Sequence, residues 1–154
     1  MKWVFDDGGR SEAGFKGRTG DCVCRAIAIA TQHPYKEIYN LINECAKGER
    51  RGKRKHGVSN ARTGVYKNTE RKVMELLGWK WIPTMKIGQG CKVHLQEDEL
   101  PKGRLVVSLS HHFTAVIDGV IHDTYDPNDR GVLVDAYGNN ITTNRCVYGY
   151  YMKG

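Results

Sequence analysis

An α+β fold is predicted by the order of the sequence patterns: helix-like stretches come first, and strand-like stretches follow from residue 79 onward. Runs of helices followed by runs of strands are typical of this class. The length of 154 residues, with 40% hydrophobic and 27% charged residues, suits one globular domain with a core. We therefore expect a single domain over residues 1–154, with N-terminal helices packed on a C-terminal antiparallel β-sheet.

The first helix is predicted to begin at Cys22. The stretch CVCRAIAIA (22–30) is apolar and rich in alanine, and the preceding Asp21 suits an N-cap. Pro34 suits the first helical position of a second helix that runs to about Ala46. The first helix would therefore carry a cysteine at its N-terminal end.

Residues 48–67 (GERRGKRKHGVSNARTGVYK) are expected to form a loop, because they are glycine-rich, charged and aperiodic. A third short helix is predicted from Asn68 or Thr69 through Leu77. The formal net charge of +7 is concentrated here, since residues 47–72 alone carry +8. Such a segment is either a solvated loop or a contact for nucleic acid or another polyanion. The candidate polyanion-binding residues are Arg50, Arg51, Lys53, Arg54 and Lys55.

The chain after residue 78 is predicted to be mainly β. WKWI (79–82) and RLVVSL (104–109) are short strand-like runs. The clearest element is HFTAVIDGVIHDTYD, in which Asp118 and Gly119 join two apolar runs as a two-residue hairpin turn. VLVDA and RCVYGYY, with YGNN between them, are expected to complete the antiparallel sheet.

The hairpin turn also predicts which side chains share a face of the sheet. If the turn has two residues, Ile117 pairs with Val120 and the register continues outward along both strands. His112 and Asp123 then lie on one face as diagonal neighbours. A carboxylate beside a histidine fixes its tautomer and stabilises the imidazolium ion. The face holds His112, Thr114, Asp123 and Tyr125.

A thiol at a helix N-terminus would complete this set. Backbone amides and the helix dipole stabilise the thiolate of Cys22, and its own N–H would be free to bind an oxyanion. Cys24 lies about 200° further round the helix and is expected to pack in the core. Cys22 as nucleophile, His112 as base and Asp123 as the orienting acid form a coherent set for acyl transfer.

The order of a cysteine opening an early helix, a histidine starting a late strand and an acidic residue on the next strand resembles papain-like cysteine peptidases. That resemblance implies a cysteine hydrolase, a peptidase or isopeptidase with a thioester acyl-enzyme, a protein or peptide substrate, and no cofactor. The family's glutamine ahead of the cysteine is absent from FKGRTGD (15–21), where Lys16, Arg18 or Thr19 would have to substitute. The related transglutaminase-like and acyltransferase folds use the same triad, so acyl transfer stays open beside hydrolysis.

A second resemblance is to a set of uncharacterised bacteriophage proteins. It is carried by GDCVCRAIAIAT, ARTGVYKNTERKV, GWKWIPTM, GCKVHL and HFTAVIDGVIHDTYDPN. It covers most of the chain and implies no activity. An alternative function is therefore a non-catalytic phage module that binds a host factor or nucleic acid through the basic loop. A third is an inactive papain-like scaffold used for binding, which fits the missing glutamine.

Other classes of site are disfavoured by the sequence. C-x-C with adjacent His111 and His112 does not match zinc spacing, so we expect no metal. No apolar stretch approaches a membrane span, and MKWVFDDGGR has no signal core. The five cysteines are odd in number and show no framework spacing. We expect reduced thiols in a cytoplasm, the host's if the chain is phage-encoded.

Overall fold

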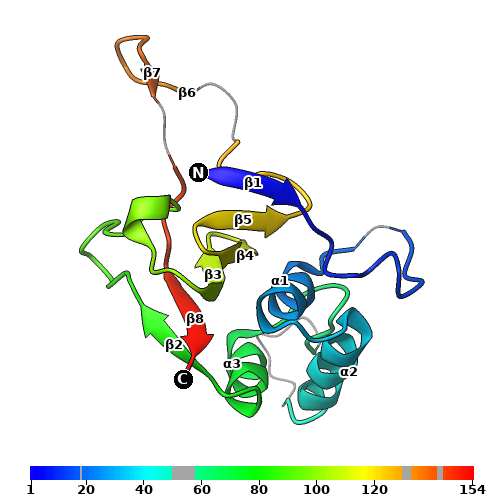
Figure 1. Ribbon diagram of the computed structural model, residues 1–154. Coiled ribbons are helices and arrows are strands. Elements are labelled where there is room, and N and C mark those ends of the chain that lie inside the picture. Colours follow the sequence, from blue (N-terminus) through cyan, green and yellow to red (C-terminus); the bar gives the residue numbers. More distant parts are fainter. Residues whose placement is uncertain (18, 50–57, 130–132, 142–143) are drawn as a thin grey trace.

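The computed structural model describes residues 1–17, 19–49, 58–129, 133–141 and 144–154. Within them, three α-helices lie together against one face of a six-stranded sheet (Figure 1). The helices are α1 (Cys22–Thr31), α2 (Tyr35–Ala46) and α3 (Lys67–Leu76), with a short 3₁₀ helix η1 (Glu97–Glu99). The strands of the large sheet are β1 (Lys2–Phe5), β2 (Trp79–Pro83), β3 (Arg104–Leu109), β4 (His112–Ile117), β5 (Val120–Asp123) and β8 (Gly149–Lys153). The α+β class is confirmed.

Helix α1 begins at Cys22, as predicted, and all but its two terminal residues are buried. Asp21 holds the N-cap position, but its carboxylate makes no capping hydrogen bond with the helix amides. It binds the side chains of Arg25 and Tyr35 instead. The helix ends where Gln32 adopts a left-handed conformation with φ of 61°.

The starts of α2 and α3 differ from the prediction by one or two residues. Pro34 is the N-cap of α2 and not its first helical residue, because its ψ of 141° is extended. Helix α3 starts at Lys67, after an extended Tyr66. These shifts leave the buried faces unchanged, since Ile38 and Val73 still point into the core.

The large sheet is mixed, so the prediction of a purely antiparallel sheet is wrong at one edge. The strand order is β1-β5-β4-β3-β8-β2, and β1 pairs in parallel with β5. All four residues of β1 are exposed, and its partner lies more than 100 residues along the chain. Neither a hydrophobic alternation nor a local turn therefore marked this strand in the sequence.

The segment VLVDA does not join the large sheet, which is a second correction. Its strand β6 (Leu133–Val134) pairs with β7 (Asn140–Ile141) in a separate two-stranded ribbon that projects away from the body (Figure 1). RCVYGYY does reach the sheet, but only from Gly149 onward, as β8. The turn in YGNN therefore closes the small ribbon.

The β4–β5 hairpin has the predicted register. Ile117 pairs with Val120, and Asp118 and Gly119 form the turn with φ of 48° and 81°. Positive φ at both central residues is the geometry of a type I′ turn, which Asp-Gly favours. This register places the start of β4 beside the end of β5, where His112 and Asp123 lie.

Apolar side chains cover both faces of β4. The helices pack on one face through Val106, Ala115 and Tyr151. On the other face, Val116 packs in a second cluster that includes Leu95. The polar residues His112 and Asp123 lie at the open end of the hairpin, and α1 packs against both of its strands.

Cys91 and Cys146 form a disulfide, so the expectation that all five cysteines are free thiols is wrong for these two. They are 55 residues apart, and no spacing rule links them. Cys22, Cys24 and Cys45 are free. Among the described residues, no helix has both the length and the apolar character that spanning a bilayer requires.

Candidate active site

Helix α1 packs against β4 and brings Cys22 to the start of that strand. The thiol lies close enough to the ring of His112 and to the backbone N–H of Phe113 for both groups to lower its pKa. Cys22 is half-buried. As the first residue of α1, it carries a backbone N–H without an acceptor inside the helix. A nucleophilic sulfur and a donor for a developing oxyanion are thus combined in one residue.

His112 is held by Asp123 on the side away from the sulfur. Its Nε2 donates to Asp123 Oδ2 over 2.7 Å, and both residues are buried. That bond places the ring proton on Nε2, so Nδ1 is the nitrogen that exchanges a proton with Cys22. The hydroxyl of Tyr125 lies 3.1 Å from Nδ1, with the two rings 5.0 Å apart. Tyr125 therefore steadies the imidazole in the free protein.

The pKa values of the three groups shift in the directions that favour an ion pair. Burial raises the pKa of Cys22, but the hydrogen bonds from His112 and Phe113 and nearby positive charge bring it below that of a free thiol. Burial lowers the pKa of His112, and the bonds to Asp123 and Cys22 outweigh this and raise it. For Asp123, burial raises the pKa, and His112 with Arg25 holds it below the usual range. Thiolate, imidazolium and carboxylate are each stabilised.

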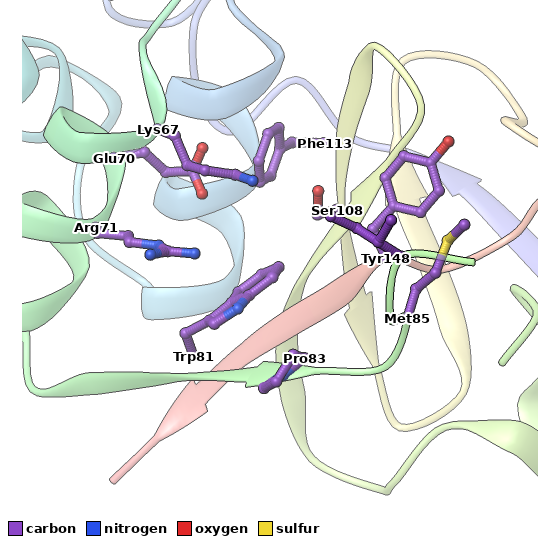
Figure 2. Close-up of a pocket in the computed structure, with 10 residues that line it drawn as sticks. Lys67, Glu70, Arg71, Trp81, Pro83, Met85, Ser108, Phe113 and Tyr148 are labelled. Atoms are coloured by element: carbon purple, nitrogen blue, oxygen red, sulfur yellow. The ribbon is translucent and has the colours of Figure 1, made fainter. Parts of the chain in front are cut away.

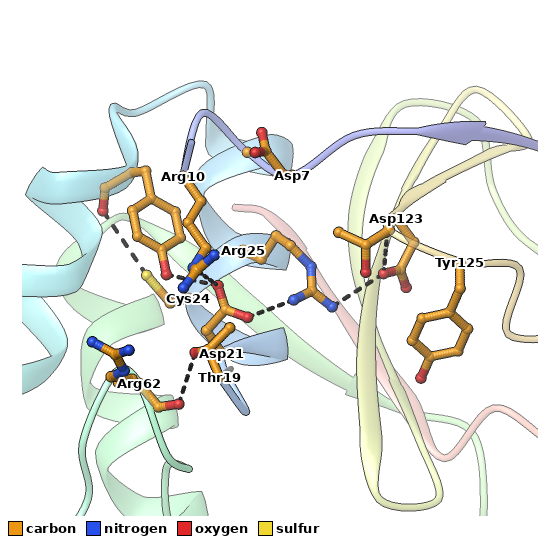
Figure 3. Close-up of polar contacts among 12 residues, drawn as sticks. Asp7, Arg10, Thr19, Asp21, Cys24, Arg25, Arg62, Asp123 and Tyr125 are labelled. Atoms are coloured by element: carbon orange, nitrogen blue, oxygen red, sulfur yellow. Dashed lines mark hydrogen bonds and ion pairs between the residues drawn. The ribbon is translucent and has the colours of Figure 1, made fainter. Parts of the chain in front are cut away.

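A buried arginine links the helix that carries Cys22 to the acid of the hairpin (Figure 3). Arg25 Nη2 lies 3.2 Å from Asp123 Oδ1, and Arg25 Nη1 lies 2.5 Å from Asp21 Oδ1. Tyr35 donates its hydroxyl to the other oxygen of Asp21 over 2.6 Å. Arg10 completes the set at 3.8 Å from Asp21. Because every carboxylate has a cationic or hydroxyl partner, the network tolerates burial.

Cys24 lies on the other flank of α1 and has the opposite chemistry. It is fully buried, and its sulfur lies 3.9 Å from the backbone oxygen of Tyr35. Burial and the charge of Asp21 raise its pKa to about 12. The prediction that Cys24 packs in the core is confirmed.

The structure brings together the three residues that the sequence singled out, Cys22, His112 and Asp123. Sequence reasoning missed Arg25, although an aspartate four residues before an arginine on a helix is a recognised pairing signal. Tyr125 was placed on the shared face without a role. The candidate polyanion-binding residues, Arg50, Arg51, Lys53, Arg54 and Lys55, lie outside the described residues.

Of the proposed substitutes for the missing glutamine, the two that the structure describes are Lys16 and Thr19. The hydroxyl of Thr19 donates to the backbone oxygen of Arg62, and Lys16 is exposed. Arg18 lies outside the described residues. Across the part of the chain that the structure describes, no group of three His, Cys, Asp or Glu side chains could hold a metal ion.

A groove of about 430 Å³ lies beside the nucleophile and shares one wall with it. Phe113 forms that wall, since its backbone N–H lowers the pKa of Cys22 and its side chain lines the groove. Figure 2 shows the groove between α3 on one side and β2 with its following loop on the other. The lining residues are Lys67, Glu70, Arg71, Trp81, Pro83, Met85, Ile87, Ser108, Phe113 and Tyr148.

Comparison with known proteins identifies no relative: no protein-family model, no curated protein and no solved structure matches this chain.

Proposed function

We propose that this protein is a papain-like cysteine hydrolase, a peptidase or isopeptidase, with Cys22 as nucleophile, His112 as base and Asp123 as the orienting acid. The observation that carries the proposal is the arrangement of the three side chains: the His112 ring is bonded to the Asp123 carboxylate over 2.7 Å and lies close enough to the Cys22 thiol to lower its pKa. Each of the three pKa shifts favours the charged form that this reaction requires. A merely structural cysteine would resemble Cys24, whose pKa is raised.

In this mechanism, His112 Nδ1 takes the thiol proton and leaves an imidazolium ion beside the Cys22 thiolate. The thiolate attacks the acyl carbon of the substrate, and the Cys22 N–H binds the oxygen that becomes negative. The C–N or C–O bond then breaks, and the imidazolium gives its proton to the leaving group. Cys22 is now a thioester. Asp123 stays ionised throughout and holds the ring.

Water completes the cycle by hydrolysing the thioester. His112 removes a proton from the water, which attacks the thioester carbon, and the carboxylic acid product leaves. The proton then returns to the sulfur. An amine in place of water would give acyl transfer through the same steps. The groove at Phe113 supports a polypeptide substrate, because an apolar cavity lined by the residue that follows His112 can hold a side chain of a peptide bound at the site.

The test is to trap the acyl-enzyme with a small ester that has no side chain to bind in the groove. We expect p-nitrophenyl acetate to release nitrophenol in a burst and to leave an acetyl group on Cys22, located by peptide mass spectrometry. His112→Ala should remove the burst, whereas Cys24→Ala should keep it. Acetylation spread equally over the free cysteines, or a burst that survives His112→Ala, would refute the proposal.

A further inference from the structure

The groove beside Cys22 combines an aromatic and apolar interior with two cations at its rim. Trp81, Phe113 and Tyr148 supply aromatic surface (Figure 2). Met85 and Ile87, which follow β2 in the chain, add apolar side chains to the lining. Several of these side chains are exposed in the free protein, with Ile87 completely so. Exposed apolar surface around a cavity is typical of a surface that a ligand covers.

The cations come from successive turns of α3. Lys67 and Arg71 are both exposed and line the groove. The Arg71 guanidinium lies 5.8 Å from the centre of the Trp81 ring, so it is held against the aromatic wall. Between them, Glu70 is buried and accepts a hydrogen bond from the Tyr151 hydroxyl over 2.8 Å. Glu70 also lines the groove, so its carboxylate, bonded to Tyr151, lies beside the two cations.

We propose that this groove selects acidic peptide segments, in which a large apolar side chain enters between Trp81 and Phe113 and an adjacent carboxylate pairs with Lys67 and Arg71. The proposal depends on the proposed function, because it assigns the groove to the substrate of Cys22. The two rim cations repel a basic segment of the same shape. A neutral segment gains the apolar contacts alone.

Glu70 makes this selection depend on pH. Burial raises its pKa to about 7, against the lowering effect of Tyr151, Lys67 and Arg71, which are the titratable and charged groups that face it from β8 and α3. Above that pH the Glu70 carboxylate offsets one of the two cations. Below it Glu70 is neutral and both cations act on the ligand. Affinity for an acidic segment should therefore increase as the pH falls through about 7.

The experiment measures binding to the Cys22→Ala variant, so that turnover plays no part. The probes are the acetylated and amidated tripeptides Glu-Phe-Ala, Gln-Phe-Ala and Lys-Phe-Ala, titrated by calorimetry. At about pH 6 and low ionic strength, we expect the Glu peptide to bind about threefold to fivefold more tightly than the Gln peptide, and the Lys peptide most weakly. Raising the ionic strength should reduce the difference.

Three variants locate the effect. Arg71→Gln should remove most of the preference for the Glu peptide, whereas Lys80→Gln, a charge change on β2 outside the groove, should keep it. Glu70→Gln should reduce the change of the preference between about pH 6 and 8, and the change that remains belongs to His112. Failure of all three peptides to bind, equal binding of all three, tighter binding of the Lys peptide, or a preference that Arg71→Gln leaves intact would overturn the proposal. Acetylation of Cys22 by the nitrophenyl ester would be unaffected by any of these results, so the two proposals fail separately.

Discussion

The two ends of the stretch CVC face different regions of the molecule. Cys22 meets the open end of the β4–β5 hairpin, where a histidine, a backbone N–H and an arginine surround its sulfur with hydrogen-bond donors and positive charge. Cys24 meets the Tyr35 side of α1, where burial and the Asp21 carboxylate oppose ionisation. The pKa of the first thiol is lowered and that of the second is raised.

A position at a helix N-terminus is therefore not sufficient to lower the pKa of a thiol. Both cysteines lie in the first turn of α1, and both lie within the influence of Arg25. What separates them is the pair of side chains from the far end of the chain, His112 and Asp123. The carboxylate–arginine network shifts the two thiol pKa values in opposite directions. The negative charge of Asp21 raises the pKa of Cys24, and the positive charge of Arg25 lowers the pKa of Cys22.

The largest expected effect is on the nucleophile itself. Cys22→Ser should reduce nitrophenyl ester hydrolysis by about 10³-fold or more, because a hydroxyl in this site cannot ionise as the thiol does. Steady-state ester hydrolysis measures this, with thermal unfolding as the check that the variant folds. Retention of more than about a tenth of the activity would show that the ester reacts elsewhere.

The next effect concerns the arginine that joins the two regions. Arg25→Lys keeps the charge but cannot reach both Asp21 and Asp123 with two bonds. We expect the midpoint of the Cys22 alkylation profile to rise by up to about one pH unit, because Asp123 loses the partner that keeps it ionised and in place.

Arg10→Lys is the matched control, since Arg10 contacts Asp21 at 3.8 Å but not Asp123. It should leave the midpoint unchanged. Equal shifts in the two variants would mean that the charge near Asp21 matters and that the bridge to Asp123 does not. Thermal unfolding of both variants separates a lost fold from a shifted midpoint.

The smallest effect on reactivity is expected at Cys24. Cys24→Ala removes a fully buried sulfur and should lower the free energy of unfolding by about 1–2 kcal/mol. Ester hydrolysis should change by less than about twofold, because the Cys22 contacts are not touched. Urea unfolding and hydrolysis rates measure the two quantities. A large loss of hydrolysis without a loss of stability would show that the two flanks of α1 are coupled.

Local patterns were enough to predict the parts of the site that depend on neighbours in sequence. The Asp-Gly turn fixes the hairpin register, and with it the closeness of His112 and Asp123. The alanine-rich run after Asp21 correctly starts α1 at Cys22. The approach of α1 to β4 was inferred from the chemical fit of a helix-terminal thiol with a histidine and an aspartate, and from a resemblance in element order, since nothing local specifies which helix meets which strand.

Features that depend on distant pairing escaped the sequence. Strand β1 is a short exposed edge strand whose partner β5 lies more than 100 residues further along the chain. The Cys91–Cys146 disulfide joins two cysteines 55 residues apart, and no cysteine motif in the sequence indicates this pairing. Only one of the two ion pairs of Arg25 could be predicted from the sequence. Its partner Asp21 is four residues away, whereas Asp123 is 98 residues away. Such pairings are decided by the packing of the sheet and not by any window of residues.

Activation of Cys22 by His112 is tested by the midpoint of the pH profile with which Cys22 is alkylated. Iodoacetamide reacts with thiolate, so the rate at each cysteine, followed by peptide mapping, increases as the pH passes the pKa of that thiol. We predict that Cys22 reacts with a midpoint below about 8.5, the value of a free thiol, and that His112→Ala moves it up to that value or beyond. Cys24 should stay unlabelled in the folded protein. A Cys22 midpoint at or above that of a free thiol, or one that His112→Ala leaves in place, would contradict the account.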